Sequence, residues 1–144
     1  MNKQIRSRII LAALAVLTAL AFTACADLLA KPVSISDRLT SFTAELNKAD
    51  RSQVYTNLDS AAANFSKAKP SKFWDDAFGT DIPFTLGAIN ASDPNAVTAK
   101  LTSANKLFDY TVTFGMSSTG TFNPVYLIKS ISYTAGTTPI TVFN

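Results

Sequence analysis

The chain has 144 residues, of which 47% are hydrophobic and 16% are charged, and it contains one cysteine and no histidine. This length suits one domain with a hydrophobic core, and this balance of residues excludes a disordered polyelectrolyte and a coiled coil. The lack of histidine excludes Ser-His-Asp and Cys-His catalysis and any His-ligated metal site, and a single cysteine cannot form an internal disulfide.

The net charge of +3 comes from the N-terminus, where Lys3, Arg6 and Arg8 face no acidic residue before Cys25. The rest of the chain is neutral, and its lysines are spread along the sequence instead of forming a cluster. Proteins that bind nucleic acids need a clustered basic surface that neutralises phosphates. We therefore expect no nucleic-acid partner.

The first residues have the pattern of an export signal. A short basic segment, residues 1–8, precedes the uncharged run Ile9–Phe22. As a helix this run would extend about 21 Å, which is short of the ~30 Å hydrocarbon core of a bilayer. The pattern predicts a cleaved signal peptide and argues against a permanent anchor helix.

The only cysteine follows directly, in Phe22-Thr23-Ala24-Cys25. This motif resembles the lipobox of bacterial lipoproteins. Phe22 stands where Leu is usual, so the resemblance is to the relaxed form of the lipobox that is known from spirochaetes. The resemblance implies that residues 1–24 are a lipoprotein signal peptide and that the mature chain begins at a Cys25 carrying diacylglycerol and palmitate. Residues 25–35 would form a tether, and two or three acyl chains would hold the protein at a membrane of the cell envelope.

Ala26 follows the cysteine directly. By the sorting pattern of enterobacterial lipoproteins, this residue favours a location at the outer membrane over one at the inner membrane. The protein would then lie on the periplasmic or the surface face of the outer membrane. The alternative is an ordinary signal peptide that is cleaved after Ala24 or Ala26, with Cys25 incidental.

Apolar residues at helical spacing predict three helices at the start of the domain. Ser36 is expected to cap the first helix, in which Leu39, Phe42 and Leu46 share one face. The second helix is expected to start at Asp50 or Ser52 and to run to about Phe65, because Lys67–Pro70 would end it. The third is expected over Lys72–Phe78, with Ser71 as its N-cap and Gly79 as its C-terminal stop.

From residue 82 onward, apolar residues alternate with polar ones, which is the period of a β-strand. Short breaks rich in turn residues, including Ser117–Pro124, favour antiparallel pairing of successive strands. We expect an α+β fold in which N-terminal helices pack on the apolar face of a sheet of four to five strands. The candidate strands are Ile82–Ala88, Val97–Thr102, Phe108–Met116, Val125–Tyr133 and Thr138–Phe143.

The opening of this region, Phe42–Asp50 followed by Val54, Tyr55 and Leu58, is similar to the pattern of the NTF2-like (cystatin-like) superfamily. This resemblance implies that residues 36–144 form a single domain in which helices fill a curved antiparallel sheet. Enzymes of the superfamily use Asp with Tyr, or Asp with His. No residue here maps onto those positions, so we expect neither catalysis nor a cofactor.

No metal site is expected either. Asp75 and Asp76 are the strongest candidate pair, but adjacent residues on a helix point about 100° apart and do not share a ligand. Asp109, on the polar face of its strand, is expected to face solvent.

The aromatic residues of the domain suggest a pocket at the wide end of the curved sheet, lined by Trp74, Phe78, Tyr110 and Phe114. We expect Trp74 and Tyr110 nearest its opening, because each has an apolar body and a polar tip that needs a partner. Such a pocket predicts a non-catalytic binding or interaction lipoprotein that takes a small apolar ligand or an envelope protein. A purely structural envelope lipoprotein with a filled core, and an NTF2-like enzyme, remain the alternatives.

Overall fold

The computed structural model describes residues 31–105, 108–135 and 137–144. Within these residues it contains helical segments followed by a five-stranded antiparallel sheet in the order β1-β2-β3-β4-β5, so the expected α+β class is confirmed. The helical segments are α2 (Ile35–Leu46), the 3-10 turns η1 (Val54–Asn57) and η2 (Phe65–Ala68), and α3 (Ser71–Phe78). The strands are β1 (Phe84–Asn90), β2 (Val97–Ser103), β3 (Phe108–Thr119), β4 (Val125–Ala135) and β5 (Thr138–Phe143).

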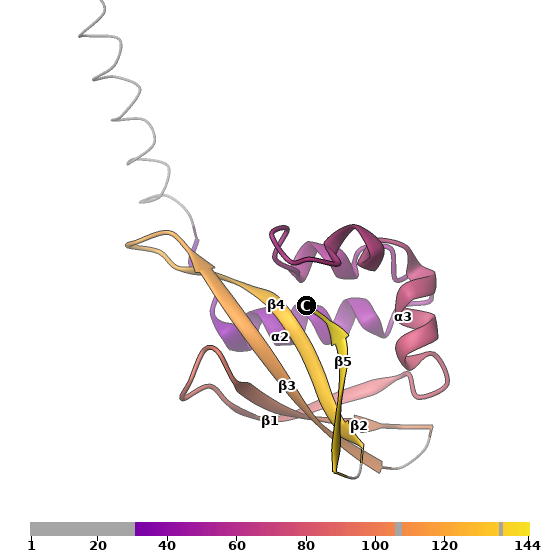
Figure 1. Ribbon diagram of the computed structural model, residues 1–144. Coiled ribbons are helices and arrows are strands. Elements are labelled where there is room, and N and C mark those ends of the chain that lie inside the picture. The colour runs from indigo at the N-terminus through magenta and orange to yellow at the C-terminus, as the bar shows by residue number, and fades with distance from the viewer. Residues whose placement is uncertain (1–30, 106–107, 136) are drawn as a thin grey trace, which may run out of the picture.

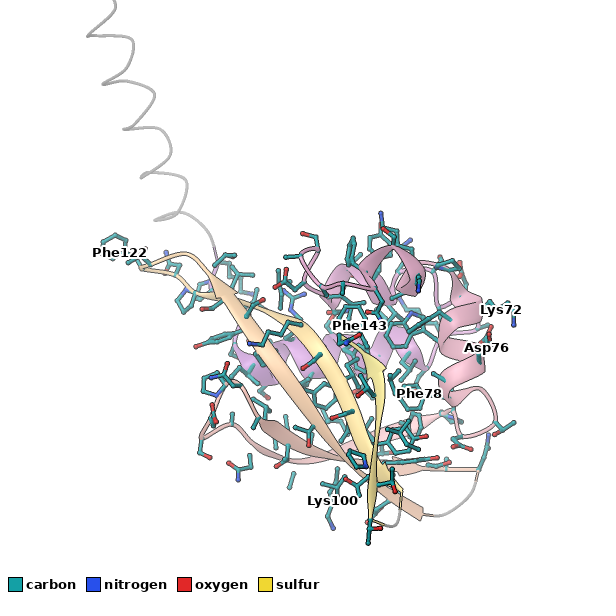
Figure 2. All side chains as sticks on the ribbon, viewed as in Figure 1. Lys72, Asp76, Phe78, Lys100, Phe122 and Phe143 are labelled. Atoms are coloured by element: carbon teal, nitrogen blue, oxygen red, sulfur yellow. The ribbon has the colours of Figure 1, made fainter. Side chains whose placement is uncertain are left out.

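The helical segments cover one face of the sheet. In the view of Figure 1, α2 crosses behind β3 and β4, and α3 stands at the side where β5 lies. The buried core between these layers includes Phe42 from α2, Phe114 from β3 and Phe143 from β5. Figure 2 labels Phe78 and Phe143, whose side chains lie among those of this core.

Helix α2 begins earlier than expected, because Ser34 and not Ser36 is its N-cap. The Ser34 hydroxyl accepts a hydrogen bond from the Asp37 N–H at 3.1 Å, and the Asp37 carboxylate accepts one from the Ser34 N–H. A capping box of this kind needs an acidic or amide residue three positions after the cap. Ser34 has Asp37 there, whereas Ser36 would have Leu39.

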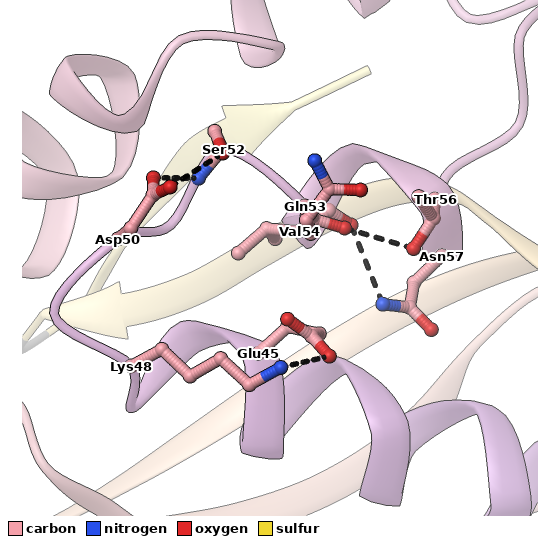
Figure 3. Close-up of polar contacts among 8 residues, drawn as sticks. All are labelled: Glu45, Lys48, Asp50, Ser52, Gln53, Val54, Thr56 and Asn57. Atoms are coloured by element: carbon pink, nitrogen blue, oxygen red, sulfur yellow. Dashed lines mark hydrogen bonds and ion pairs between the residues drawn. The ribbon is translucent and has the colours of Figure 1, made fainter.

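The expected second helix is wrong. The chain between Asp50 and Lys67 forms the short turns η1 and η2, because Leu58 takes an extended conformation and bridges to Ile128 of β4. The Asp59 N–H then donates to the Ile128 carbonyl at 2.7 Å. Figure 3 shows local contacts that also compete with a continuous helix, among them the Asp50 carboxylate accepting from the Ser52 N–H at 2.9 Å.

The strands follow the expected pattern with shifted ends. Strand β1 begins at Phe84, since Pro83 has no N–H to give to a ladder, and β3 runs on through Thr119, into the segment expected as a turn. Gly115 lies at the register shift between β3 and β4, and its N–H donates to the Ser130 hydroxyl at 3.1 Å. A Cβ at position 115 would collide with that hydroxyl, so a larger residue there would force the Ser130 side chain to turn away and give up this hydrogen bond.

The outer edge of β4 is covered by three different segments. Strand β5 pairs with its C-terminal half, Leu58 bridges to Ile128, and Val33 bridges in parallel to Val125. The Val33 N–H donates to the Pro124 carbonyl at 3.1 Å, and the Val33 carbonyl accepts from the Tyr126 N–H at 3.1 Å. The exposed edge that invites non-native strand pairing is thereby shortened.

Candidate functional site

A groove of about 360 Å³ lies between α3 and β5. This α3–β5 groove is lined by five apolar or aromatic side chains and two polar ones: Phe73, Ala77, Tyr133, Ile140, Val142, Asp76 and Thr141. A concave, mainly apolar surface of this size with few polar groups is typical of small-molecule sites.

The groove exists because the helical segments leave part of the sheet face uncovered at the β5 edge, beside α3. Ile140 of the edge strand β5 pairs with Tyr133 of β4 and stays 39% exposed. Apolar surface on the covered face of the sheet is therefore left open beside α3.

The rim of the groove is electrically neutral. Lys72 donates to both oxygens of Asp76, one turn further along α3, at 2.6 and 2.8 Å. Hydrogen bonding to this carboxylate, followed by its charge, raises the pKa of Lys72 above its ordinary value. Asp75 points elsewhere and pairs with Arg51 at 2.7 Å, so the two adjacent acids do diverge as expected. The rim therefore favours neither cationic nor anionic ligands.

An aromatic cluster backs the groove. The Tyr133 ring lies 5.2 Å from that of Tyr110 and 6.2 Å from that of Phe78, measured between centroids. The Tyr110 hydroxyl donates to the Asp81 carboxylate. Burial, and next this hydrogen bond, raises the pKa of Tyr110, so the phenol stays protonated across the physiological range.

The residues predicted from the sequence to bind a ligand lie behind this groove instead of lining it. Trp74, Phe78 and Phe114 are buried in the core, and Tyr110 is half-buried. The expected position of Trp74 at an opening is wrong: its ring packs on Phe42, and its indole N–H donates to the Ala68 carbonyl at 2.8 Å. The polar tip that suggested a pocket mouth finds its partner inside the protein.

The sequence prediction missed Ile140 as a groove residue and considered Tyr133 only as one of the aromatic residues of the domain. One signal for Ile140 was present, because the last expected strand contains apolar residues and the expected helix before the sheet, Lys72–Phe78, is very short. Such a helix cannot cover a five-stranded sheet, and the last strand of a meander lies at the edge, where cover runs out first.

A second, smaller hollow of about 240 Å³ lies over β1, β2 and β3 near the register shift between Leu86 and Ile89. It includes Lys100, which pairs with Asp109 at 3.7 Å, and no aromatic side chain lines it. It is thus smaller than the α3–β5 groove and lacks the aromatic side chains that line that groove.

Within residues 31–105, 108–135 and 137–144, no three acidic, cysteine or histidine side chains lie close enough to hold a metal ion, and no helix is long and apolar enough to cross a membrane. The predicted signal peptide, Cys25 and most of the predicted tether lie outside these residues. No protein-family model, curated protein or solved structure matches the chain.

Proposed function

We propose that this protein is a membrane-anchored bacterial envelope lipoprotein whose domain is a non-catalytic binding module. The α3–β5 groove is its site for a small apolar or amphipathic ligand. The observation that carries this proposal is the open apolar surface between Phe73 and Ile140, backed by Tyr133 and bordered by a neutral ion pair. Removal of such surface from water is worth roughly 25 cal/mol per Å².

The anchor rests on Phe22-Thr23-Ala24-Cys25 and on the lack of any second cysteine. Acyl chains on Cys25 would hold the mature protein at the outer membrane, on its periplasmic or surface face. Cells expressing the wild type should incorporate labelled palmitate into the protein, and the Cys25→Ser variant should not. Label that persists in the variant, or a mature N-terminus at another residue, would contradict the anchor.

The order of elements, with helices before a five-stranded antiparallel sheet, supports an NTF2-like (cystatin-like) fold. The pairing of Tyr110 with Asp81 has the residue types that enzymes of this superfamily use. Neither residue lines the α3–β5 groove or the smaller hollow. This separation favours a structural role for the pair and a binding role for the domain.

The ligand proposal is tested by titrating residues 31–144 with N-phenyl-1-naphthylamine, a neutral aromatic probe whose fluorescence rises in apolar sites. Ile140→Asp should weaken binding at least about tenfold, because it places a charge where the probe would lie. Phe122→Asp is the matched control, since Phe122 is exposed but does not line the groove. Equal losses in both variants, or none in either, would contradict the site.

A purely structural envelope lipoprotein is the second candidate. The observation in its favour is that Trp74 and Phe114, which were expected to line a pocket, fill the core with 0% and 1% exposure. This candidate predicts that the probe does not bind residues 31–144 at all, while the palmitate experiment still succeeds.

A further inference from the structure

Phe122 stands at the tip of the β3–β4 hairpin and is 73% exposed, more than any other large hydrophobic residue that the structure describes. Figure 2 shows it pointing away from the body of the domain. The surrounding segment, residues 117–124, contains no charged side chain. An aromatic side chain in this setting loses little solvation when it enters an apolar phase.

The N-terminal end of the described chain lies against the same hairpin. Val33 is hydrogen-bonded on both sides to the start of β4, through Pro124 and Tyr126, directly after the tip. Figure 1 shows the first described residues beside this hairpin. The α3–β5 groove lies toward the other end of β4, where Tyr133 pairs with Ile140.

We propose that the β3–β4 hairpin tip, through Phe122, is a second contact with the lipid surface to which Cys25 is attached. This inference rests on the proposed lipid anchor. Eight peptide units separate Cys25 from Val33, and a fully extended chain of that length reaches at most about 28 Å. The anchor therefore keeps Val33, and with it the hairpin tip, within about that distance of the membrane.

One aromatic side chain suffices for this contact because the anchor has already brought the bilayer to it. Tethering converts the second contact into an intramolecular event with a high effective concentration of lipid. The contact would turn the α3–β5 groove away from the lipid and toward the aqueous compartment.

The test uses the full mature lipidated protein in vesicles of phosphatidylethanolamine and phosphatidylglycerol. The thioether on Cys25 consumes its thiol, so Thr119→Cys provides a single labelling site for a nitrobenzoxadiazole dye beside the tip. Doxyl-labelled phospholipid in the vesicles quenches a dye that touches the bilayer. Thr138→Cys, exposed at the start of β5, is the matched control at the far end of β4.

We expect strong quenching at position 119 and little at position 138. Adding Phe122→Ser should lower the equilibrium constant of this contact about tenfold, the lower end of the effect of exposing one buried Phe side chain, and quenching at position 119 should fall with it. Unchanged quenching after Phe122→Ser, or equal quenching at both sites, would overturn the inference. The inference would also be overturned if the protein floats with the vesicles but shows no quenching at position 119. That result would leave the anchor intact and point to a protein partner for Phe122. A wild type that fails to float with vesicles would instead overturn the anchor, and the inference with it.

Discussion

Phe73 and Trp74 are neighbours on α3, with ring centroids 4.9 Å apart, yet they belong to two different regions of the molecule. Trp74 lies in the filled core with Phe42 and Phe114, where α2 covers the sheet. Phe73 lies in the open α3–β5 groove with Tyr133 and Ile140. The two regions occupy the same face of the same sheet. An aromatic residue on that face therefore does not mark a ligand site by itself. Whether a helix covers that part of the sheet decides whether the residue lies in the core or in an open groove.

The largest effect separates the core from the groove. Phe114→Ala should lower the free energy of unfolding by about 3–5 kcal/mol, because it leaves a cavity under α2. Ile140→Ala should cost less than about 1 kcal/mol, because the side chain is already partly in solvent. Urea denaturation of both variants measures this difference. Similar, large losses at both positions would show that the groove is part of the core.

The next effect concerns the indole of Trp74. Trp74→Phe should cost about 1–3 kcal/mol, since it leaves the buried Ala68 carbonyl without the hydrogen bond that the indole N–H donates. Phe73→Leu, at the neighbouring position, should cost less because Phe73 is half-buried and donates no such bond. Thermal unfolding followed by far-UV circular dichroism compares the two. A larger loss for Phe73→Leu would reverse the assignment of these side chains to the two regions.

The boundary between the regions was beyond the reach of sequence reasoning. Alternation located β2 well, because its apolar residues at positions 97, 99 and 101 are all buried. The same reasoning extended a helix through Leu58, whose bridge to Ile128 is a contact between distant parts of the chain that no local pattern encodes. It also assigned Trp74 to an opening, since only the fold reveals that the Ala68 carbonyl meets the indole.

A smaller effect on stability should appear at the hydrogen bond between Ser117 and Asp59, which holds the Leu58–Asp59 segment beside the core. Ser117 donates to the Asp59 carboxylate at 2.6 Å, and this bond is the main reason that the pKa of Asp59 is lowered, with the Ala61 N–H second. A lowered pKa stabilises the fold above the ordinary value near 4, and that stability is lost as pH falls through the folded-state pKa. Ser117→Ala should cost about 1 kcal/mol at pH 6.

The difference between wild type and Ser117→Ala should shrink between pH 6 and pH 2, as pH falls through the folded-state pKa and Asp59 takes up a proton. Urea midpoints at the two pH values measure it. Thr119→Ala, at an exposed position on the same strand, is the control and should show no comparable dependence on pH. If the difference in stability between the two proteins stays constant with pH, the charge of the Asp59 carboxylate does not contribute to stability through Ser117.

The smallest effect should be at the rim of the groove. Lys72→Ala removes the ion pair with Asp76, but both side chains are largely in solvent, so the urea midpoint should not change measurably. Binding of the neutral probe should also persist, because the apolar lining is untouched. A clear loss of probe binding in this variant would show that the rim, and not the apolar floor, determines what the groove accepts.

The bridge between Val33 and Val125 also has a mechanical consequence. A pulling force on the chain ahead of Lys31 meets the two backbone hydrogen bonds of Val33, to Pro124 and Tyr126, before it reaches the capping box at Ser34. These bonds pass the load into β4, whose neighbours β3 and β5 share it across the sheet. Helix α2 is thus shielded from tension, and the core that it covers stays intact until the Val33 bridge gives way.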